Sequence, residues 1–148
     1  MPQNPPEGTP PLMPYLYYED PDAALEFLTG AFGFHERFKM TGDDGRITHA
    51  EVDAGDGAVV MFGRPGAEYR NPKHLGAATQ SIYVYVDDVD AHFDVAKAAG
   101  AEVLREPADQ FYGDRTYMVA DPEGHQWGFA THVRDVSPEE MQTAGATS

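Results

Sequence analysis

A segment in the first half of the chain returns in the second half with nearly the same chemistry. Residues 17–23 (YYEDPDA) and residues 85–91 (YVDDVDA) are separated by a constant offset of 68 positions (85 − 17). Each copy joins an apolar stretch to acidic residues and then to an amphipathic pattern. Such a duplication predicts two similar supersecondary units packed side by side. The groove between two such units is a natural place for a ligand.

Length and composition limit the class of protein. A chain of 148 residues is long enough for one domain with a real core. It has no cysteine, so it cannot form disulfides, a thiolate nucleophile or a zinc–sulfur site. No run approaches the roughly 20 apolar residues that span a bilayer, and the start lacks the basic and apolar regions of a signal peptide. We therefore expect a cytoplasmic protein.

The chain is strongly acidic. Its formal net charge is −15, from 25 Asp and Glu against 10 Lys and Arg. Nucleic acids and anionic membranes both require a positive surface, so neither is expected as a partner. A negative field would concentrate cationic small molecules. The alternative interpretation is that the acidity serves only solubility.

The first copy is predicted to run strand, helix and three strands. Residues 12–18 are apolar and aromatic, and Asp20 then caps a helix over 21–32 with Pro21 at its first position. Gly33 ends the helix. Alternation and turn residues predict three further strands, at about 34–40, 46–52 and 57–63.

The second copy repeats this order. Asp88 is expected to cap a helix that ends at Gly100. The predicted strands are at 81–86, 101–106, 115–120 and 126–131. The fold class is therefore α+β, with two βαβββ modules forming a concave mixed sheet. We expect the following organisation: a flexible proline-rich arm (1–11), one domain (12–132) with modules 12–63 and 80–132 and a linker 64–79, and a C-terminal tail (133–148). In the tail, a short helix is predicted after Ser137, and no fixed structure from Thr143 onward.

The paired modules resemble the glyoxalase/bleomycin-resistance/extradiol-dioxygenase superfamily, also called vicinal oxygen chelate proteins. The likeness covers residues 12–132 and depends on the two helix motifs at 20–34 and 88–101. The motifs at 112–115 (YGDR) and 121–127 (DPEGHQW) are similar to its glyoxalase-like branch. The resemblance implies a homodimer, with each cup-shaped site either within one chain or between two chains.

Metal-dependent members of this superfamily use four strand positions that face a central cup. Those positions correspond here to Met13, Met61, Ser81 and Gly128. A thioether is a soft ligand, and serine and glycine side chains offer little to a divalent cation. We therefore expect no metal and no other cofactor, and we favour a protein that is not an enzyme.

The same alternation predicts which residues line the cup, because side chains two apart on a strand share a face. Four tyrosines dominate this lining, and they would suit a planar, partly aromatic guest. The alternative is that these tyrosines only fill the sheet face or a subunit interface. The predicted ligand-binding residues are Tyr15, Tyr17, Met61, Tyr83, Tyr85, Tyr112, Arg115 and Gln126.

Two other groups have open interpretations. His49 and Glu51 share one strand face and would start a replacement metal site or an acid/base couple, although a surface hydrogen-bonded pair is favoured. Arg115 would bind an anionic group, or would pin the neighbouring loop through an ion pair with Asp114. His74 and His92 are interpreted as ordinary surface residues.

These observations predict a metal-free small-molecule binding protein similar to bleomycin-resistance members. It would sequester a planar and cationic ligand in an aromatic cup. The alternative is a glyoxalase-like lyase or isomerase, or a dioxygenase-type enzyme, with a non-standard site around His49 and Glu51. A third interpretation is an accessory domain with a vestigial cup.

Overall fold

The computed structural model describes residues 1–146 and contains the two predicted βαβββ modules. The first module comprises β1 (Tyr15–Tyr17), α1 (Pro21–Phe32), β2 (His35–Thr41), β3 (Ile47–Asp53) and β4 (Val59–Gly63). The second comprises β5 (Ser81–Tyr85), α3 (Val89–Ala98), β6 (Glu102–Asp109), β7 (Asp114–Ala120) and β8 (Gln126–His132). A short helix, α2 (Pro72–Leu75), lies between the modules, and α4 (Pro138–Ala146) follows them. The predicted α+β class is confirmed.

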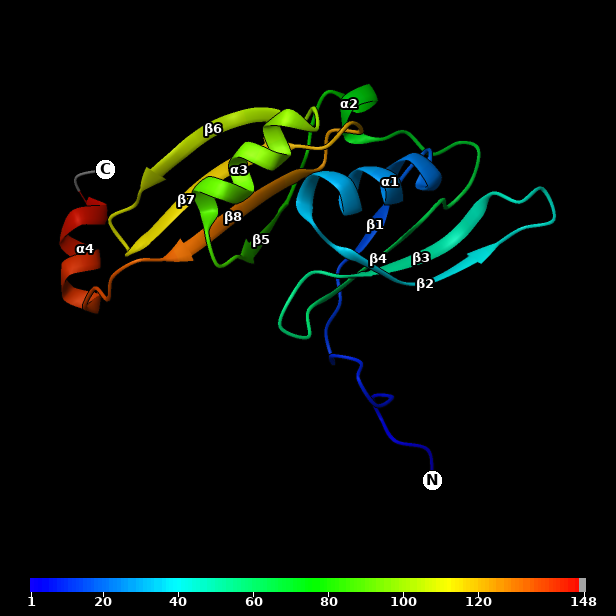
Figure 1. Ribbon diagram of the computed structural model, residues 1–148, viewed down its shortest axis with the longest axis horizontal. Helices are drawn as coiled ribbons and strands as arrows, with labels where there is room; N and C mark the ends of the chain where they lie inside the picture. Colours follow the sequence, from blue (N-terminus) through cyan, green and yellow to red (C-terminus); the bar gives the residue numbers. More distant parts are fainter. Residues whose placement is uncertain (147–148) are drawn as a thin grey trace.

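Each module builds its own four-stranded mixed sheet. The strand orders are β1-β4-β3-β2 and β5-β8-β7-β6, and they have the same topology. In each sheet the first strand pairs in parallel with the last, and the other pairs are antiparallel. Helices α1 and α3 pack against each other where the modules meet (Figure 1). The N-terminal arm is attached to the first sheet, because the Gly8 carbonyl and the Thr9 hydroxyl accept hydrogen bonds from Arg37 of β2.

The two long helices begin in the same way. The Asp20 carboxylate accepts a hydrogen bond from the Ala23 N–H, and the Asp88 carboxylate accepts one from the Ala91 N–H. Each bond satisfies one of the free N–H groups at a helix start. At the other end of α1, Gly33 has a φ of 70°, a left-handed conformation that glycine adopts without strain.

Proline explains two differences from the predicted strands. Strand β1 is shorter than predicted because Pro14, just before it, has no N–H to donate, although its carbonyl still accepts from Met61. Strand β6 extends through Pro107 to Asp109, beyond the predicted end. It tolerates this proline because it is the edge strand and its register with β7 shifts between Arg105 and Ala108.

Two helices differ from the prediction. Helix α2 forms inside the predicted linker, because the Asn71 side chain accepts from the His74 N–H and Pro72 stands at its first position. Helix α4 starts after Ser137 as predicted but continues to Ala146, so the prediction of a loose tail from Thr143 was wrong. Residues 147–148 of the predicted tail lie outside the described residues.

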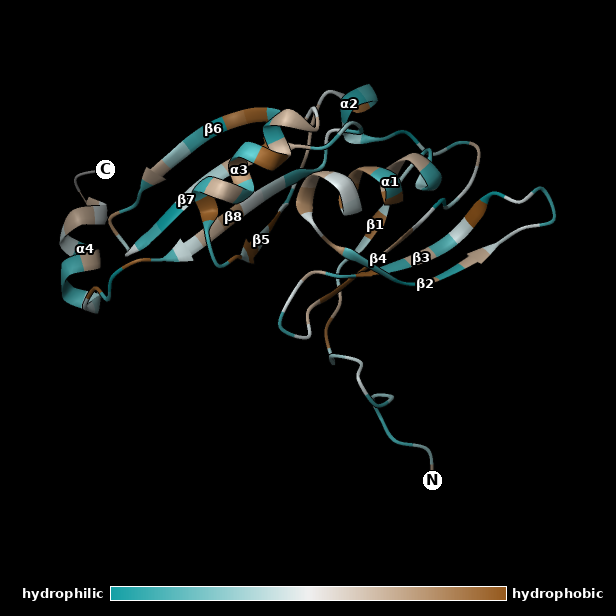
Figure 2. Cartoon of the chain, viewed as in Figure 1, coloured by the Kyte–Doolittle hydropathy of each residue, from teal (hydrophilic) through white to brown (hydrophobic). Residues whose placement is uncertain are grey.

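The core lies between the helices and the sheets. Trp127, Phe129 and Tyr117 of the second sheet are fully buried, and Phe32 of α1 contacts Trp127 and Phe129. Trp127 is therefore packed beneath α1. Hydrophilic residues dominate α2 and the turn between β2 and β3, which lie at the periphery (Figure 2). No helix within residues 1–146 has the length and apolar character required to cross a bilayer.

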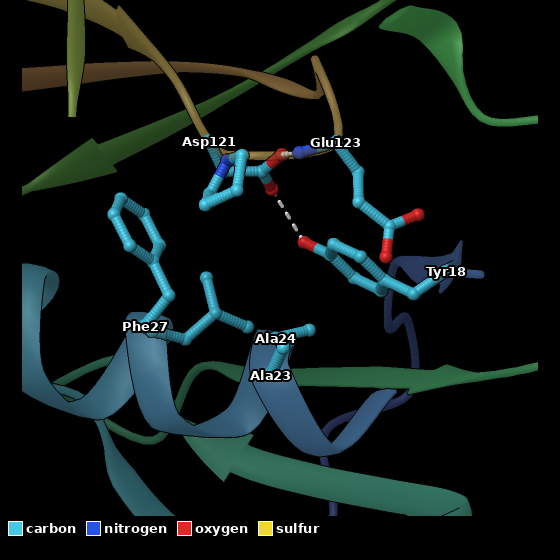
Figure 3. A pocket seen from close by; sticks show the side chains of 8 residues that line it. Tyr18, Ala23, Ala24, Phe27, Asp121 and Glu123 are labelled. Carbon is cyan, nitrogen blue, oxygen red and sulfur yellow. Dashed lines mark hydrogen bonds between the residues drawn. The ribbon is translucent and has the colours of Figure 1, made fainter. Parts of the chain in front are cut away.

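A buried carboxylate joins the two modules. The Tyr18 hydroxyl, at the end of β1, donates to Asp121 at 2.6 Å, and the Trp127 indole N–H donates to the same oxygen at 3.1 Å. Figure 3 shows Tyr18 reaching Asp121 beside a small pocket under α1. In the same turn, Glu123 accepts from the backbone N–H groups of Glu19 and Asp20. These bonds attach the β7–β8 turn to the start of α1.

Candidate functional site

Two pairs of tyrosines stand on the sheet faces that point away from the core. The side chains that alternate with them are buried: Leu16 is 2% exposed and Val84 is 8% exposed. The tyrosines themselves are 42–58% exposed. The exposed residues are Tyr15 and Tyr17 on β1, and Tyr83 and Tyr85 on β5. Each sheet therefore presents one aromatic platform. We name Tyr15 and Tyr17 the first platform, and Tyr83 and Tyr85 the second platform.

A buried aspartate holds the second tyrosine pair. Asp114, at the start of β7, is only 3% exposed. Its carboxylate accepts hydrogen bonds from the hydroxyls of Tyr83 at 2.6 Å and Tyr85 at 2.8 Å. The two rings meet edge to face, with centroids 5.5 Å apart. The hydroxyls are therefore engaged with the protein, while about half of each tyrosine remains exposed.

His132 completes this network on the neighbouring strand. It is the register partner of Asp114 across β7 and β8. Its Nδ1 is hydrogen-bonded to the Asp114 carboxylate at 2.8 Å, and its Nε2 is hydrogen-bonded to the Asp135 carboxylate at 2.8 Å. We name Asp114, His132, Tyr83 and Tyr85 the Asp114 cluster.

The electrostatics of the Asp114 cluster follow from burial and hydrogen bonding. Burial acts to raise the pKa of Asp114, but the bonds from Tyr83, His132 and Tyr85 outweigh it and lower the pKa. Burial and the bond to Asp114 raise the pKa of Tyr83, to which Tyr112 also contributes. The bond to Asp114 raises the pKa of Tyr85. At neutral pH the aspartate is thus ionised and both phenols are protonated donors.

The first tyrosine pair has different polar partners. The Tyr15 hydroxyl is hydrogen-bonded to His49 Nδ1 at 3.0 Å, and His49 Nε2 is bonded to Glu51 at 2.9 Å. Arg37 pairs with Glu51 at 3.3 Å. His49 and Glu51 thus form the hydrogen-bonded pair that alternation predicted. Burial raises the pKa of Tyr15, and the charges of Tyr17 and Glu51 raise it further.

The register places Met61 opposite a tyrosine and Gln126 opposite Ser81, two residues before Tyr83 on β5. Met61 pairs with Tyr15 across β1 and β4, and Gln126 pairs with Ser81 across β5 and β8. Gly128 stands opposite Tyr83, where an added Cβ would lie 3.5 Å from the tyrosine ring. A larger side chain at Gly128 would therefore occupy the space beside the platform.

Arg115 does not join the tyrosines. Successive residues of β7 face opposite ways, so Arg115 points to α3 when Asp114 points to the platform. Its guanidinium pairs with Asp90 on α3 at 2.9 Å and with Asp109 at 3.2 Å. The predicted partner Asp114 is therefore wrong, but the pair with Asp109 joins the two ends of the β6–β7 turn, as the loop-pinning interpretation predicted. Tyr112 is half-buried in the β6–β7 turn and contacts Phe111.

Sequence reasoning missed the roles of Asp114 and His132. Alternation of side chains along β7 and β8 could have revealed these roles, because it places Asp114 and His132 on the same side of the sheet as the tyrosines. His92 was also misplaced: it is half-buried, with its ring bonded to the Tyr117 hydroxyl and the Phe32 carbonyl. His74 is exposed, as predicted, and binds Glu19.

The residues present do not fit a divalent metal at the positions used by the metal-dependent superfamily members. Met13, Met61, Ser81 and Gly128 provide no set of imidazole and carboxylate donors. Within residues 1–146 no group of three or more His, Asp or Glu side chains is arranged to hold a metal ion.

The fold and these platforms define a two-module protein of the βαβββ class, and comparison with known proteins identifies its family. The sequence model of the Glyoxalase/Bleomycin resistance protein/Dioxygenase superfamily matches residues 11–129. The chain therefore belongs to this superfamily, and it has the vicinal oxygen chelate fold.

Three similar proteins illustrate the range of the family. An uncharacterised protein of Mycobacterium bovis is 37% identical over 140 residues, which cover 91% of each chain. The crystal structure of TioX from Micromonospora sp. ML1 is 38% identical with a TM-score of 0.68, covering 82% of this chain and 98% of TioX. A probable lactoylglutathione lyase of Vibrio cholerae is 34% identical over 113 residues, covering 72% of this chain and 78% of that protein.

Proposed function

We propose that this protein binds a planar, aromatic small molecule without a metal and sequesters it, as a bleomycin-resistance-like protein. The observation that carries the proposal is the pair Tyr83 and Tyr85, whose hydroxyls are fixed by Asp114 and whose side chains are about half exposed. Rings fixed in this way lose little conformational freedom when a guest stacks on them, which favours affinity. Stacked aromatic pairs each contribute about 0.5–1.5 kcal/mol.

The arrangement suits binding better than catalysis. The phenols of Tyr83 and Tyr85 are donors to an ionised carboxylate and have raised pKa values, so they are poor bases at neutral pH. Arg115 is engaged with Asp90 and Asp109. The second sheet thus offers shape and aromatic area, without a group poised to take a proton from the guest.

We further propose that the complete cup forms between two copies of the chain. Within residues 1–146, the ring contacts of the platform tyrosines join Tyr15 to Tyr17 and Tyr83 to Tyr85, with none between the two pairs. The sheets instead meet through α1 and α3. A homodimer would set the first platform of one chain opposite the second platform of its partner and enclose the guest from both sides.

Thermal denaturation with a ligand panel tests the proposal. The panel contains planar cationic antibiotics of the bleomycin and mitomycin type, and divalent metals in separate wells. A ligand at 100 times its dissociation constant adds about 2.7 kcal/mol of stability, which a melting curve detects. We expect stabilisation by a planar ligand that is lost in Tyr83→Ala. If no ligand stabilises the protein, or if Tyr83→Ala responds equally, the platform is not the binding site.

One observation favours a second function, an enzyme of the glyoxalase-like or dioxygenase type. Tyr15, His49 and Glu51 form a continuous hydrogen-bonded chain, and such a chain can carry a proton between a phenol and a carboxylate. Elemental analysis of the purified protein discriminates between the two functions. A stoichiometric metal that is lost in His49→Ala would favour the enzyme, whereas metal-free protein with ligand-dependent melting would favour sequestration.

A further inference from the structure

We propose that Asp114 makes the second platform selective for cations, so that the preferred guest carries its positive charge over Tyr83 and Tyr85. This inference rests on the proposed binding function and names the charge of the ligand. A buried carboxylate lies at the hydroxyl ends of two aromatic side chains that are each about half exposed.

The negative charge of Asp114 lacks a permanent cationic partner. In the described part of the chain, its ion pair is with His132, and no lysine or arginine contacts it. His132 also binds the carboxylate of Asp135. The three ionisable groups therefore sum to a negative charge whether His132 is protonated or neutral. Tyr83 and Tyr85 are the other groups that face the carboxylate, and both are uncharged donors at neutral pH.

The hydrogen bonds to Asp114 make the rings of Tyr83 and Tyr85 more negative on the side that solvent reaches. A phenol that donates a hydrogen bond to a carboxylate becomes more electron-rich, because the bond polarises the O–H toward the oxygen. The face of an aromatic ring already attracts cations through its quadrupole. Because Asp114 is removed from water, its field is weakly screened at the ring faces. The platform thus combines ring attraction and a fixed negative charge.

The first platform differs in this respect. Its carboxylate, Glu51, is compensated by Arg37 at 3.3 Å, and the Tyr15 hydroxyl contacts the His49 ring rather than a carboxylate. Selectivity for a cation is therefore expected from the β5 side. On the same strand as Asp114, Arg115 is turned away and held by Asp90 and Asp109, so it does not offset the charge.

A matched pair of probes tests the inference on the full chain. The cation 10-methylacridinium and its uncharged counterpart acridine have nearly the same shape and differ in charge at about pH 8. We expect the wild-type protein to bind the cation about tenfold more tightly. Asp114→Asn, which keeps the shape of the side chain, should lower affinity for the cation about tenfold and leave affinity for acridine unchanged. Asp109→Asn is the control, because it removes the same charge beside Arg115.

The outcomes separate this inference from the proposed function. Equal binding of the two probes, or a cation preference that survives Asp114→Asn, would overturn the inference and leave the binding function intact. Binding of neither probe would overturn both.

A second variant covers the case in which Asp114→Asn does not fold. His132 is half-exposed, so His132→Gln should fold, and it removes the proton that offsets the charge of Asp114. In the wild type, affinity for the permanently charged 10-methylacridinium should fall several-fold as pH is lowered through the pKa of His132. This pH dependence should be absent in His132→Gln. If both proteins show the same pH profile, the Asp114 cluster does not control binding of the cation.

Discussion

At the scale of single residues, the protein uses one pairing for two purposes. Asp114 and Asp121 are both 3% exposed, and each accepts a hydrogen bond from a tyrosine hydroxyl. Asp121 turns toward the core and bonds Tyr18 and Trp127, so it joins the modules. Asp114 turns toward the exposed platform. The same chemistry is structural on one side of the sheet and faces a proposed ligand on the other.

The buried hydrogen bond between Tyr18 and Asp121, which joins the two modules, gives a prediction about stability. Tyr18→Phe leaves the buried Asp121 carboxylate with one donor fewer, which should cost about 1–3 kcal/mol of unfolding free energy. Urea denaturation followed by tryptophan fluorescence measures this change. Tyr69→Phe is the control, because its hydroxyl bonds the Tyr17 carbonyl at an exposed site. Equal losses in the two variants would show that burial of the Tyr18–Asp121 bond is not what matters.

We predict that the folded protein loses stability in weak acid because His92 becomes protonated. Burial lowers its pKa below the ordinary value of about 6.5, so the folded protein favours the neutral ring. The stabilisation is therefore complete above about pH 6.5 and is lost as pH falls toward the lowered pKa. His132, whose pKa is raised by Asp114 and Asp135, acts in the opposite direction.

Melting temperatures between pH 7.5 and pH 5 check this prediction, in the interval around the ordinary histidine pKa of about 6.5. The background variant His132→Gln removes the opposing contribution. In that background, His92→Gln should flatten the decrease in melting temperature, because glutamine can bond the Phe32 carbonyl and the Tyr117 hydroxyl without titrating. An unchanged acid slope would mean that other groups, such as carboxylates, cause the loss.

At the scale of elements, the duplication is preserved in the polar contacts as well as in the strand order. Asp22 in the first turn of α1 pairs with Arg46, which stands just before β3. Asp90 in the first turn of α3 pairs with Arg115 near the start of β7. Each helix is therefore attached to the third strand of its module by the same ion pair, in addition to its aspartate cap.

The helix caps give a prediction at this scale. Asp88→Ala should lower the unfolding free energy by about 1 kcal/mol, because it leaves the N–H of Ala91 without its capping oxygen. Asp87→Ala removes the same charge one residue earlier, where the side chain caps nothing, and should have little effect. Chemical denaturation of both variants gives the comparison, and equal effects would show that charge rather than capping is responsible.

At the scale of the whole molecule, the packing of α1 on α3 has a consequence for the site. The helices occupy the space where the modules meet, as Figure 1 shows. The four tyrosines of the two platforms remain 42–58% exposed. Phe38 and Met40 on the first sheet are also about half exposed, at 48% and 52%. Exposed apolar area of this kind is typical of a surface that another molecule covers.

This arrangement predicts that ligand binding depends on association. Sedimentation velocity should show a particle of twice the 16.2 kDa chain mass. On dilution below the dimer dissociation constant, affinity for a planar ligand should fall, since each site loses the platform of the partner. A monomer that binds with the same affinity at all concentrations would place the whole site within one chain.

The sequence was sufficient for the architecture because that information is local. The repeat at 17–23 and 85–91, the caps at Asp20 and Asp88, and the alternation of Leu16 with its tyrosine neighbours each depend on residues close in the chain. These patterns predicted both modules and the faces of the strands. Near Pro14 and Pro107 the observed ends of β1 and β6 differ from the predicted ends.

The partners of polar groups that lie far apart in the chain were decided by the tertiary structure. Asp114 and Arg115 are adjacent in sequence, yet β7 turns one toward Tyr83 and the other toward Asp90 on α3. His92 is separated by 60 residues from Phe32, whose carbonyl it binds. Such contacts join residues that are distant in the chain, so a local pattern in the sequence cannot predict them. The amino-acid sequence by itself determined the two modules and their aromatic faces. Only the pairing of β5, β8 and β7 in the folded sheet decided that the Asp114 carboxylate meets the hydroxyls of Tyr83 and Tyr85.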